Sequence, residues 1–173
     1  MLTFITGGAR SGKSARAQKL AEDCAGELVY LATAQAFDDE MTDRIARHRA
    51  DRGPRWRTVD CPIDLPEAIV REAATDRVLL VDCLTLWTSN LLLAEHDFAA
   101  ASQRLIDALS QARSPVILVS NEVGMGIVPD NALARRFRDM AGRLNQDVAA
   151  IADRAELVVA GLVVSLKPAP GSA

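Results

Sequence analysis

Short apolar runs recur along the chain, separated by longer stretches in which apolar residues return every three or four positions. The short runs are typical of buried strands, and the longer spacing is typical of helices that pack on one face. The strand-like runs are residues 2–6, 27–33, 56–60, 77–82, 114–120, 156–160 and 162–166. The helix-like stretches are residues 15–21, 41–51, 62–74, 83–93, 98–112 and 130–154. This alternation predicts an open α/β sheet with helices packed against it.

The last helix-like stretch has the longest apolar stripe. Asp130 is its expected N-cap, and we expect the helix to continue to about Arg154. The stripe consists of Leu133, Phe137, Met140, Leu144, Val148 and Ile151. These residues form one continuous apolar stripe along the helix.

A glycine-rich segment with the pattern G-x-x-x-x-G-K-[ST] follows the first strand-like run. Its residues are Gly7, Gly8, Ala9, Arg10, Ser11, Gly12, Lys13 and Ser14. The glycines let the backbone wrap around phosphate oxygens, so that amide N–H groups and the next helix N-terminus point at them. We expect Lys13 to reach the β- and γ-phosphates of a nucleotide and Ser14 to ligate Mg²⁺. The alternative is a glycine-rich turn without a ligand, but the strand before it and the helix after it favour a phosphate loop.

Other polar segments also follow strand-like runs, and open α/β sheets bind ligands at the carboxyl ends of their strands. Asp82 ends the run 77–82 in the form of a Walker B acid, which faces Mg²⁺ beside a phosphate loop. Ala32, Thr33 and Ala34 end the run 27–33 and should lie near the phosphate loop. The segment 121–129 is expected to be a ligand-facing loop.

One of the two histidines, His48, lies in a helix-like stretch rich in arginine. Its neighbours are Arg44, Arg47, Arg49 and Arg52. Spacing alone is compatible with a solvated basic face and an incidental histidine. The functional alternative is a histidine that attacks phosphorus, beside guanidinium groups that stabilise the charge on phosphate oxygens. The acids at 38–40 fit helix capping, and a role in binding Mg²⁺ has no support from spacing.

Composition excludes several classes of protein. The chain has 173 residues and a formal net charge of −3, which argues against a protein that coats nucleic acid. We expect one domain over residues 1–167 and a frayed tail over 168–173. No apolar stretch approaches the roughly 20 residues that span a bilayer, and the N-terminus does not have the pattern of a signal peptide, so we expect a cytoplasmic protein.

The three cysteines, Cys24, Cys61 and Cys83, have no zinc or disulfide spacing and are expected to be reduced and mostly buried.

Several of these segments together resemble the bifunctional adenosylcobinamide kinase/adenosylcobinamide-phosphate guanylyltransferase family. They are the phosphate loop from Gly7 to Ser14, the stretch from Ala32 through the acids at 38–40 to Met41, Arg44-Ile45 with His48, Trp56-Arg57-Thr58, and the segment 121–129. The phosphate loop occurs in many families, whereas the other segments are more selective. The likeness covers nearly the whole chain, and only the short connection between Leu93 and Phe98 departs from it.

The resemblance implies a RecA-like P-loop NTPase fold with a mostly parallel central sheet flanked by helices, and a homotrimer. It implies two reactions of cobalamin nucleotide-loop assembly. ATP or GTP phosphorylates adenosylcobinamide, and GTP then transfers GMP to adenosylcobinamide phosphate, giving adenosylcobinamide-GDP and pyrophosphate. It also makes His48 the nucleophile that is transiently guanylylated, and positive charge around it favours the unprotonated imidazole.

The resemblance also assigns nucleotide contacts. They are the phosphate loop, Ala32, Thr33, Ala34, Arg49, Ala50, Asp51, Arg52, Asp60 and Asp82, with Ser14 and Asp82 on the side of the metal and Lys13 and His48 in catalysis. The preferred phosphoryl donor, the kinase base and the residues that hold the corrinoid stay open.

Three rival functions differ in what they require. A simple P-loop kinase needs only Lys13, Ser14 and Asp82. A GTP-binding switch protein needs an [NT]-K-x-D guanine motif, which the sequence lacks. A RecA-type nucleic-acid motor is expected to be larger and to carry a basic tract.

Overall fold

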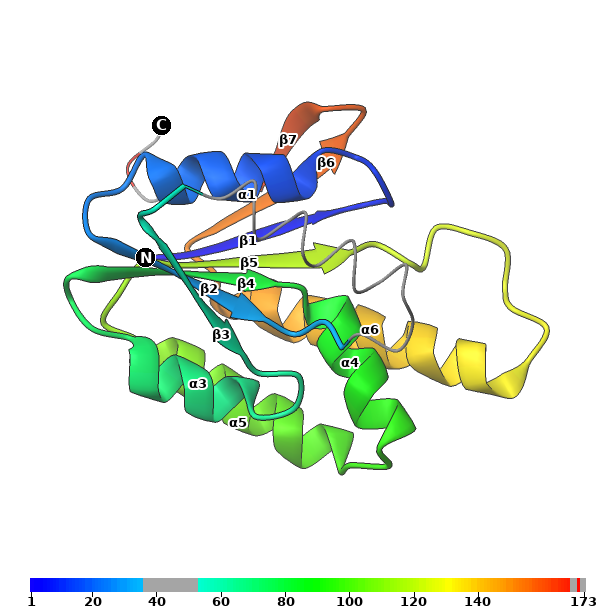
Figure 1. The fold of residues 1–173 in the computed structure, drawn as a ribbon. Helices are drawn as coiled ribbons and strands as arrows, with labels where there is room; N and C mark the ends of the chain where they lie inside the picture. Colours follow the sequence, from blue (N-terminus) through cyan, green and yellow to red (C-terminus); the bar gives the residue numbers. More distant parts are fainter. Residues whose placement is uncertain (36–52, 169–170, 172–173) are drawn as a thin grey trace.

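A computed structural model describes residues 1–35, 53–168 and 171 and places a seven-stranded sheet at the centre (Figure 1). The strands are β1 (Leu2–Gly7), β2 (Glu27–Ala32), β3 (Trp56–Asp60), β4 (Arg77–Asp82), β5 (Val116–Asn121), β6 (Arg154–Val159) and β7 (Leu162–Lys167). Their order across the sheet is β3-β2-β4-β5-β1-β6-β7. Neighbours are parallel except for β6 and β7, which form an antiparallel hairpin. The predicted RecA-like α/β fold with a mostly parallel sheet is confirmed.

The described helices cover the two faces of the sheet unequally. They are α1 (Lys13–Glu22), α3 (Leu65–Glu72), α4 (Leu84–Leu93), α5 (Phe98–Gln111) and α6 (Ala132–Ile151). Figure 1 shows α1 alone on one face, with α3, α4, α5 and α6 on the other. The buried side chains form two cores, one on each face of the sheet. Ile5, Leu80 and Val119 belong to the core under α1, and Trp87 and Leu105 belong to the core on the other face.

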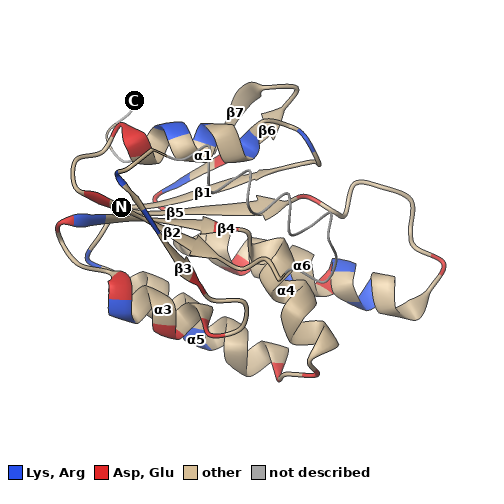
Figure 2. Cartoon of the chain, viewed as in Figure 1, with Lys and Arg blue, Asp and Glu red and all other residues tan. Residues whose placement is uncertain are grey.

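Because strand side chains alternate between faces, the residue number decides which core a side chain enters. In β4, Val78 and Leu80 point to the α1 face, whereas Leu79 and Val81 point to the other face. Asp82 therefore shares the α1 face, which is the face of the phosphate loop helix. Figure 2 shows that β1 and β5, beside this position, carry no charged residue.

The predicted last helix differs from the observed one at both ends. Asn131, not Asp130, is the N-cap, and its side chain accepts a hydrogen bond from Ala134 N at 2.7 Å. The helix ends at Ile151, because Ala152 has an extended backbone and Arg154 already pairs with Thr3 of β1. The expectation of a helix to Arg154 was wrong, because Arg154 is the first residue of strand β6.

The apolar stripe of α6 is only partly buried. Leu144 and Val148 are almost fully buried, whereas Leu133 is 54% exposed. The stripe therefore packs into the core along the second half of the helix, while its first turn faces solvent. The first turn follows the segment 122–131, which is exposed from Gly124 to Val128 and which Figure 1 shows extending away from the sheet.

The three cysteines are free, and two of them are buried, as expected. Burial raises the pKa of the Cys61 thiol to about 12 and that of Cys83 to about 11. Within the described ranges, no set of three or more His, Cys, Asp or Glu side chains is arranged to hold a metal by itself. None of the helices there combines the length and hydropathy needed to cross a bilayer.

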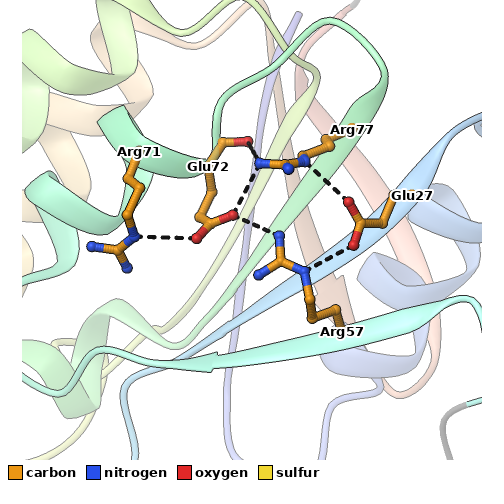
Figure 3. A network of polar contacts seen from close by, with 5 residues as sticks. All are labelled: Glu27, Arg57, Arg71, Glu72 and Arg77. Atoms are coloured by element: carbon orange, nitrogen blue, oxygen red, sulfur yellow. Dashed lines mark hydrogen bonds and ion pairs between the residues drawn. The ribbon is translucent and has the colours of Figure 1, made fainter.

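A network of ion pairs ties together the amino ends of β2 and β4, the second residue of β3 and the last turn of α3 (Figure 3). Glu72, 7% exposed, accepts hydrogen bonds from Arg57 at 2.6 Å, Arg77 at 3.1 Å and Arg71 at 3.2 Å. Glu27 binds the other sides of Arg57 and Arg77 at 2.8 and 3.0 Å. We call these five residues the Glu72 cluster. It joins three strands to α3 at the edge of the sheet opposite the carboxyl ends.

Candidate active site

The phosphate loop connects the end of β1 to the start of α1. Gly12 has a φ of 98°, a left-handed conformation that favours glycine, and it precedes the first helical residue, Lys13. No side chain caps this end of the helix, and no acid lies in its first turn. The N–H groups of the first turn are therefore available to an anion, in the positive field of the helix N-terminus.

Lys13 bends back over the loop. Its Nζ donates a hydrogen bond to the carbonyl of Gly8 at 3.1 Å, which places the ammonium group above the exposed residues Gly8, Ala9 and Arg10. Ser14 follows in the first turn and is half-buried. The loop therefore combines a positive charge, free amide donors and a hydroxyl group within one turn, as phosphate binding requires.

Three strand ends form a row beside each other on the phosphate-loop side of the sheet. Ala32 at the end of β2 pairs with Asp60 of β3 on one side and Asp82 of β4 on the other. Two carboxylates thus flank Ala32. Of the two, Asp82 lies on the strand that is nearer to β1.

Asp82 is held by a residue that sequence reasoning missed. The Tyr30 hydroxyl donates a hydrogen bond to Asp82 Oδ2 at 2.8 Å. Both side chains project toward the α1 face, and the bond fixes the direction of the carboxylate. A tyrosine two positions before the end of one strand and an acid at the end of a neighbouring strand are the signal that could have revealed the pair.

Thr33 faces inward. Its hydroxyl accepts a hydrogen bond from Cys83 N and donates one to Cys83 O, both at 2.8 Å, and its side chain is fully buried. Asn90 of α4 donates to the Thr33 carbonyl at 2.7 Å. Thr33 therefore fixes the end of β2 to the start of α4, and the half-buried Ala34 and Gln35 follow it.

The segment after β5 lies beside the phosphate loop. Glu122 N donates a hydrogen bond to Gly7 O at 3.0 Å, directly at the end of β1. The Glu122 carboxylate accepts hydrogen bonds from Gly124 N at 2.8 Å and Met125 N at 3.0 Å, which stabilises the turn. Beyond it, Ile127 is 98% exposed. The predicted ligand-facing loop therefore begins at the phosphate loop and presents apolar side chains to solvent.

Some predicted site residues lie outside the described residues. They are His48, Arg49, Ala50, Asp51 and Arg52. Among the others, the structure brings together the phosphate loop and the end of β5, and it aligns the ends of β2, β3 and β4.

Comparison with known proteins shows which family this chain belongs to. The model of the family described as cobinamide kinase / cobinamide phosphate guanyltransferase matches residues 3–166. The chain belongs to that family. A Salmonella typhimurium relative, the bifunctional adenosylcobalamin biosynthesis protein CobU, is 45% identical over 96% of this chain and 100% of its own length. The Pseudomonas aeruginosa protein CobP, of the same description, is 46% identical over 98% of this chain and 99% of its own.

The fold also occurs in a distant solved structure. A Pyrococcus horikoshii protein aligns with a TM-score of 0.56 over 99% of this chain and 87% of its own, at 7% identity. At this identity the likeness concerns the fold alone. The family assignment therefore rests on the near-full-length sequence matches, which include the phosphate loop and all the strand ends described above.

Proposed function

We propose that this chain catalyses both reactions of its family, the phosphorylation of adenosylcobinamide by ATP or GTP and the transfer of GMP from GTP to adenosylcobinamide phosphate. The observation that carries the proposal is a phosphate loop with free helix N–H groups and Lys13 above it, in a chain that matches a bifunctional family over residues 3–166. The relatives named above match this chain over nearly its whole length and theirs.

In the kinase reaction, the loop binds the triphosphate and Lys13 stabilises the negative charge that develops as the γ-phosphoryl group moves. The substrate hydroxyl forms the new bond to phosphorus, and the bond to the leaving nucleoside diphosphate breaks. The Ser14 hydroxyl and the Asp82 carboxylate are oxygen donors of the kind that Mg²⁺ prefers, and Tyr30 orients the carboxylate. Mg²⁺ held there would neutralise phosphate charge.

In the guanylyl transfer, neutral His48 attacks the α-phosphorus of GTP, and pyrophosphate leaves. An oxygen of adenosylcobinamide phosphate then attacks the same phosphorus, releasing the histidine and forming adenosylcobinamide-GDP. The roles of His48 and of Arg49, Ala50, Asp51 and Arg52 as nucleotide contacts follow from the resemblance. Those of Ala32, Thr33, Ala34 and Asp60 do too, although Thr33 is fully buried in the described part of the chain.

We further propose a homotrimer in the cytoplasm that does not bind nucleic acid. The negative net charge of −3 supports the last point. The trimer rests on the resemblance, and sedimentation of the purified chain tests it.

The covalent intermediate has a direct test. After incubation with GTP and denaturation, the mass of the wild-type chain should increase by one GMP, and the adduct should be acid-labile and stable in hydroxide. His48→Ala should abolish the increment. His96→Ala is the matched control, because His96 is the only other histidine and is exposed between α4 and α5, and this variant should be labelled like the wild type. A labelled His48→Ala chain contradicts the assignment of the nucleophile, and an unlabelled wild type favours a simple kinase.

A further inference from the structure

The β6–β7 hairpin contacts the phosphate loop along its length. Gly161 N donates a hydrogen bond to Ser11 O at 2.8 Å, in the middle of the loop. The turn consists of Ala160 and Gly161, whose φ angles of 51° and 79° are those that a two-residue hairpin turn requires. The tip of the hairpin is therefore rigid, and it points one backbone donor at the loop.

Two loop glycines fit closely against the same hairpin. A Cβ atom on Gly7 would lie 2.4 Å from the carbonyl oxygen of Val158, and one on Gly12 would lie 3.3 Å from the Gly161 Cα. Since a Cβ essentially never approaches another atom within 3.0 Å, Gly7 must be glycine because β6 lies against it. The loop conformation thus depends on the hairpin as well as on its own sequence.

A buried ion pair extends this contact into the first turn of α1. Arg16 donates from Nε and Nη2 to the two oxygens of Glu156 at 3.0 and 2.9 Å. Glu156 is 0% exposed in the middle of β6, and Arg154 pairs with it from the same strand. Burial favours the neutral acid, but the hydrogen bonds and charges of Arg16 and Arg154 outweigh it, so the pKa of Glu156 is lowered and the group is a carboxylate.

Arg16 lies close in sequence to the phosphate-binding residues of the first helical turn, so its ion pair with Glu156 affects their position. Arg16 lies three residues after Lys13 and two after Ser14, and its own N–H donates to Gly12 O at 3.0 Å. A forked guanidinium on a fixed carboxylate holds the start of the helix in position and rotation. The direction of Lys13, Ser14 and the first-turn N–H groups is then set by β6.

We propose that Arg16 and Glu156 are positioning residues for the phosphate loop, which they hold in its triphosphate-binding shape together with the turn at Gly161. Neither residue contacts the nucleotide. The inference rests on the proposed function, because it takes the loop to be the triphosphate site. It predicts that loss of the pair weakens nucleotide binding without removing any phosphate contact.

The test is calorimetric titration of the full chain with Mg²⁺ and the α,β-methylene analogue of GTP, which cannot transfer GMP. Arg16→Met and Glu156→Gln should each raise the Kd roughly tenfold, the effect of losing a charge-assisted hydrogen-bond pair. Arg16→Lys, which keeps the charge, should recover part of the affinity. In the kinase assay the KM for nucleotide should rise by a similar factor, while kcat falls much less and the KM for adenosylcobinamide stays constant.

The Glu72 cluster supplies the matched control. Glu72→Gln removes a charge from a similarly buried carboxylate paired with arginines, so it should destabilise the chain, yet its Kd for the analogue should stay within twofold of wild type. If Glu156→Gln does not fold, Arg16→Met and Arg16→Lys decide the question, because Arg16 is partly exposed and on a helix surface.

Two failures are distinguishable. If Arg16→Met binds the analogue as tightly as the wild type while Lys13→Ala does not, the positioning role is wrong and the proposed function stands. If Lys13→Ala also binds as tightly as the wild type, the loop is not the triphosphate site and the proposed function fails with it. A rise in Kd for Glu72→Gln equal to that for Arg16→Met would also overturn the inference, since general destabilisation would explain both.

Discussion

Glu156 and Glu72 are both buried carboxylates surrounded by arginines, but Glu156 lies in strand β6 whereas Glu72 lies in the last turn of α3. Glu156 lies under α1 and binds Arg16 in the turn that follows the phosphate loop. Glu72 lies at the amino ends of the strands and binds Arg57, Arg71 and Arg77, none of which adjoins a predicted site residue (Figure 3). The same chemistry therefore serves two purposes, and the partner of each carboxylate decides which.

The comparison teaches that burial and charge do not identify a functional residue by themselves. The arginines lower the pKa of both carboxylates. For Glu72 the largest cause is the hydrogen bond from Arg57. For Glu156 burial raises the pKa, and the contacts with Arg16 and Arg154 outweigh that effect. Removal of either should cost stability, because the arginines around it lose hydrogen bonds to a charged partner. Only the removal of Glu156 or its partner Arg16 should reach the nucleotide.

The largest expected effect is at the phosphate loop itself. Lys13→Ala should lower kcat/KM of both reactions by about 100- to 1000-fold, the typical cost of removing one group that stabilises transition-state charge. The free energy of unfolding should change little, since Lys13 makes one exposed hydrogen bond. Lys19→Ala is the control, an exposed lysine in the last turn of the same helix, and should keep full activity. Equal activity of Lys13→Ala and Lys19→Ala would remove the loop from the mechanism.

The second variant should lose stability and keep its activity, the opposite of Lys13→Ala. Glu72→Ala should lower the free energy of unfolding by about 2 kcal/mol, because three partly exposed arginines lose the carboxylate that they share. Urea denaturation measures the loss. Below the unfolding transition, kcat and the KM for nucleotide should match the wild type. A selective rise in that KM would mean that the amino edge of the sheet is coupled to the site, contrary to the comparison.

The phosphate loop could be predicted from the sequence, whereas the buried ion pair beside it could not. The glycine pattern and the acid that ends the run 77–82 predicted the phosphate loop and Asp82, because their chemistry is local. Glu156 was counted only as the first residue of a strand. Its partner Arg16 is 140 positions away, and nothing in local spacing links them. An acid inside an otherwise apolar strand was the available signal.

The boundaries of α6 show the same limit. Capping and periodicity predicted its existence and its buried centre, since both depend on neighbours along the helix. Its end at Ile151 depends on the pairing of Arg154 with Thr3, a contact with the first strand of the chain. The inward orientation of Thr33 likewise depends on Cys83, which lies 50 positions away.

A smaller effect is expected at Asp82. Tyr30→Phe removes the hydrogen bond to Asp82 Oδ2 and leaves the ring. We expect the Mg²⁺ concentration for half-maximal kinase activity to rise about tenfold, the usual cost of losing a partner that orients a metal ligand. The KM for adenosylcobinamide should not change. An unaltered Mg²⁺ dependence in Tyr30→Phe would contradict the role of Asp82 on the metal side.

The smallest effect is in the pH dependence of stability. Both carboxylates have pKa values lowered from the usual glutamate value of 4.5, so their contribution to stability is complete above that pH and is lost as the pH falls through the lower values of the folded state. The wild type should therefore lose stability on acidification below about pH 4.5. Glu72→Gln should show a shallower loss, measured by urea denaturation from pH 3 to 7 (roughly the range that brackets carboxylate titration). Parallel curves for the two proteins would show that Glu72 does not keep its lowered pKa in solution.

The central claim is that one phosphate site serves two reactions through a guanylylated histidine, and a chase experiment tests it most directly. The chain is labelled with α-³²P GTP, separated from free nucleotide and mixed with adenosylcobinamide phosphate. The account predicts that the label leaves the protein and appears in adenosylcobinamide-GDP, in an amount equal to the label lost. Label that stays on the protein, or that leaves only as free GMP, would contradict it.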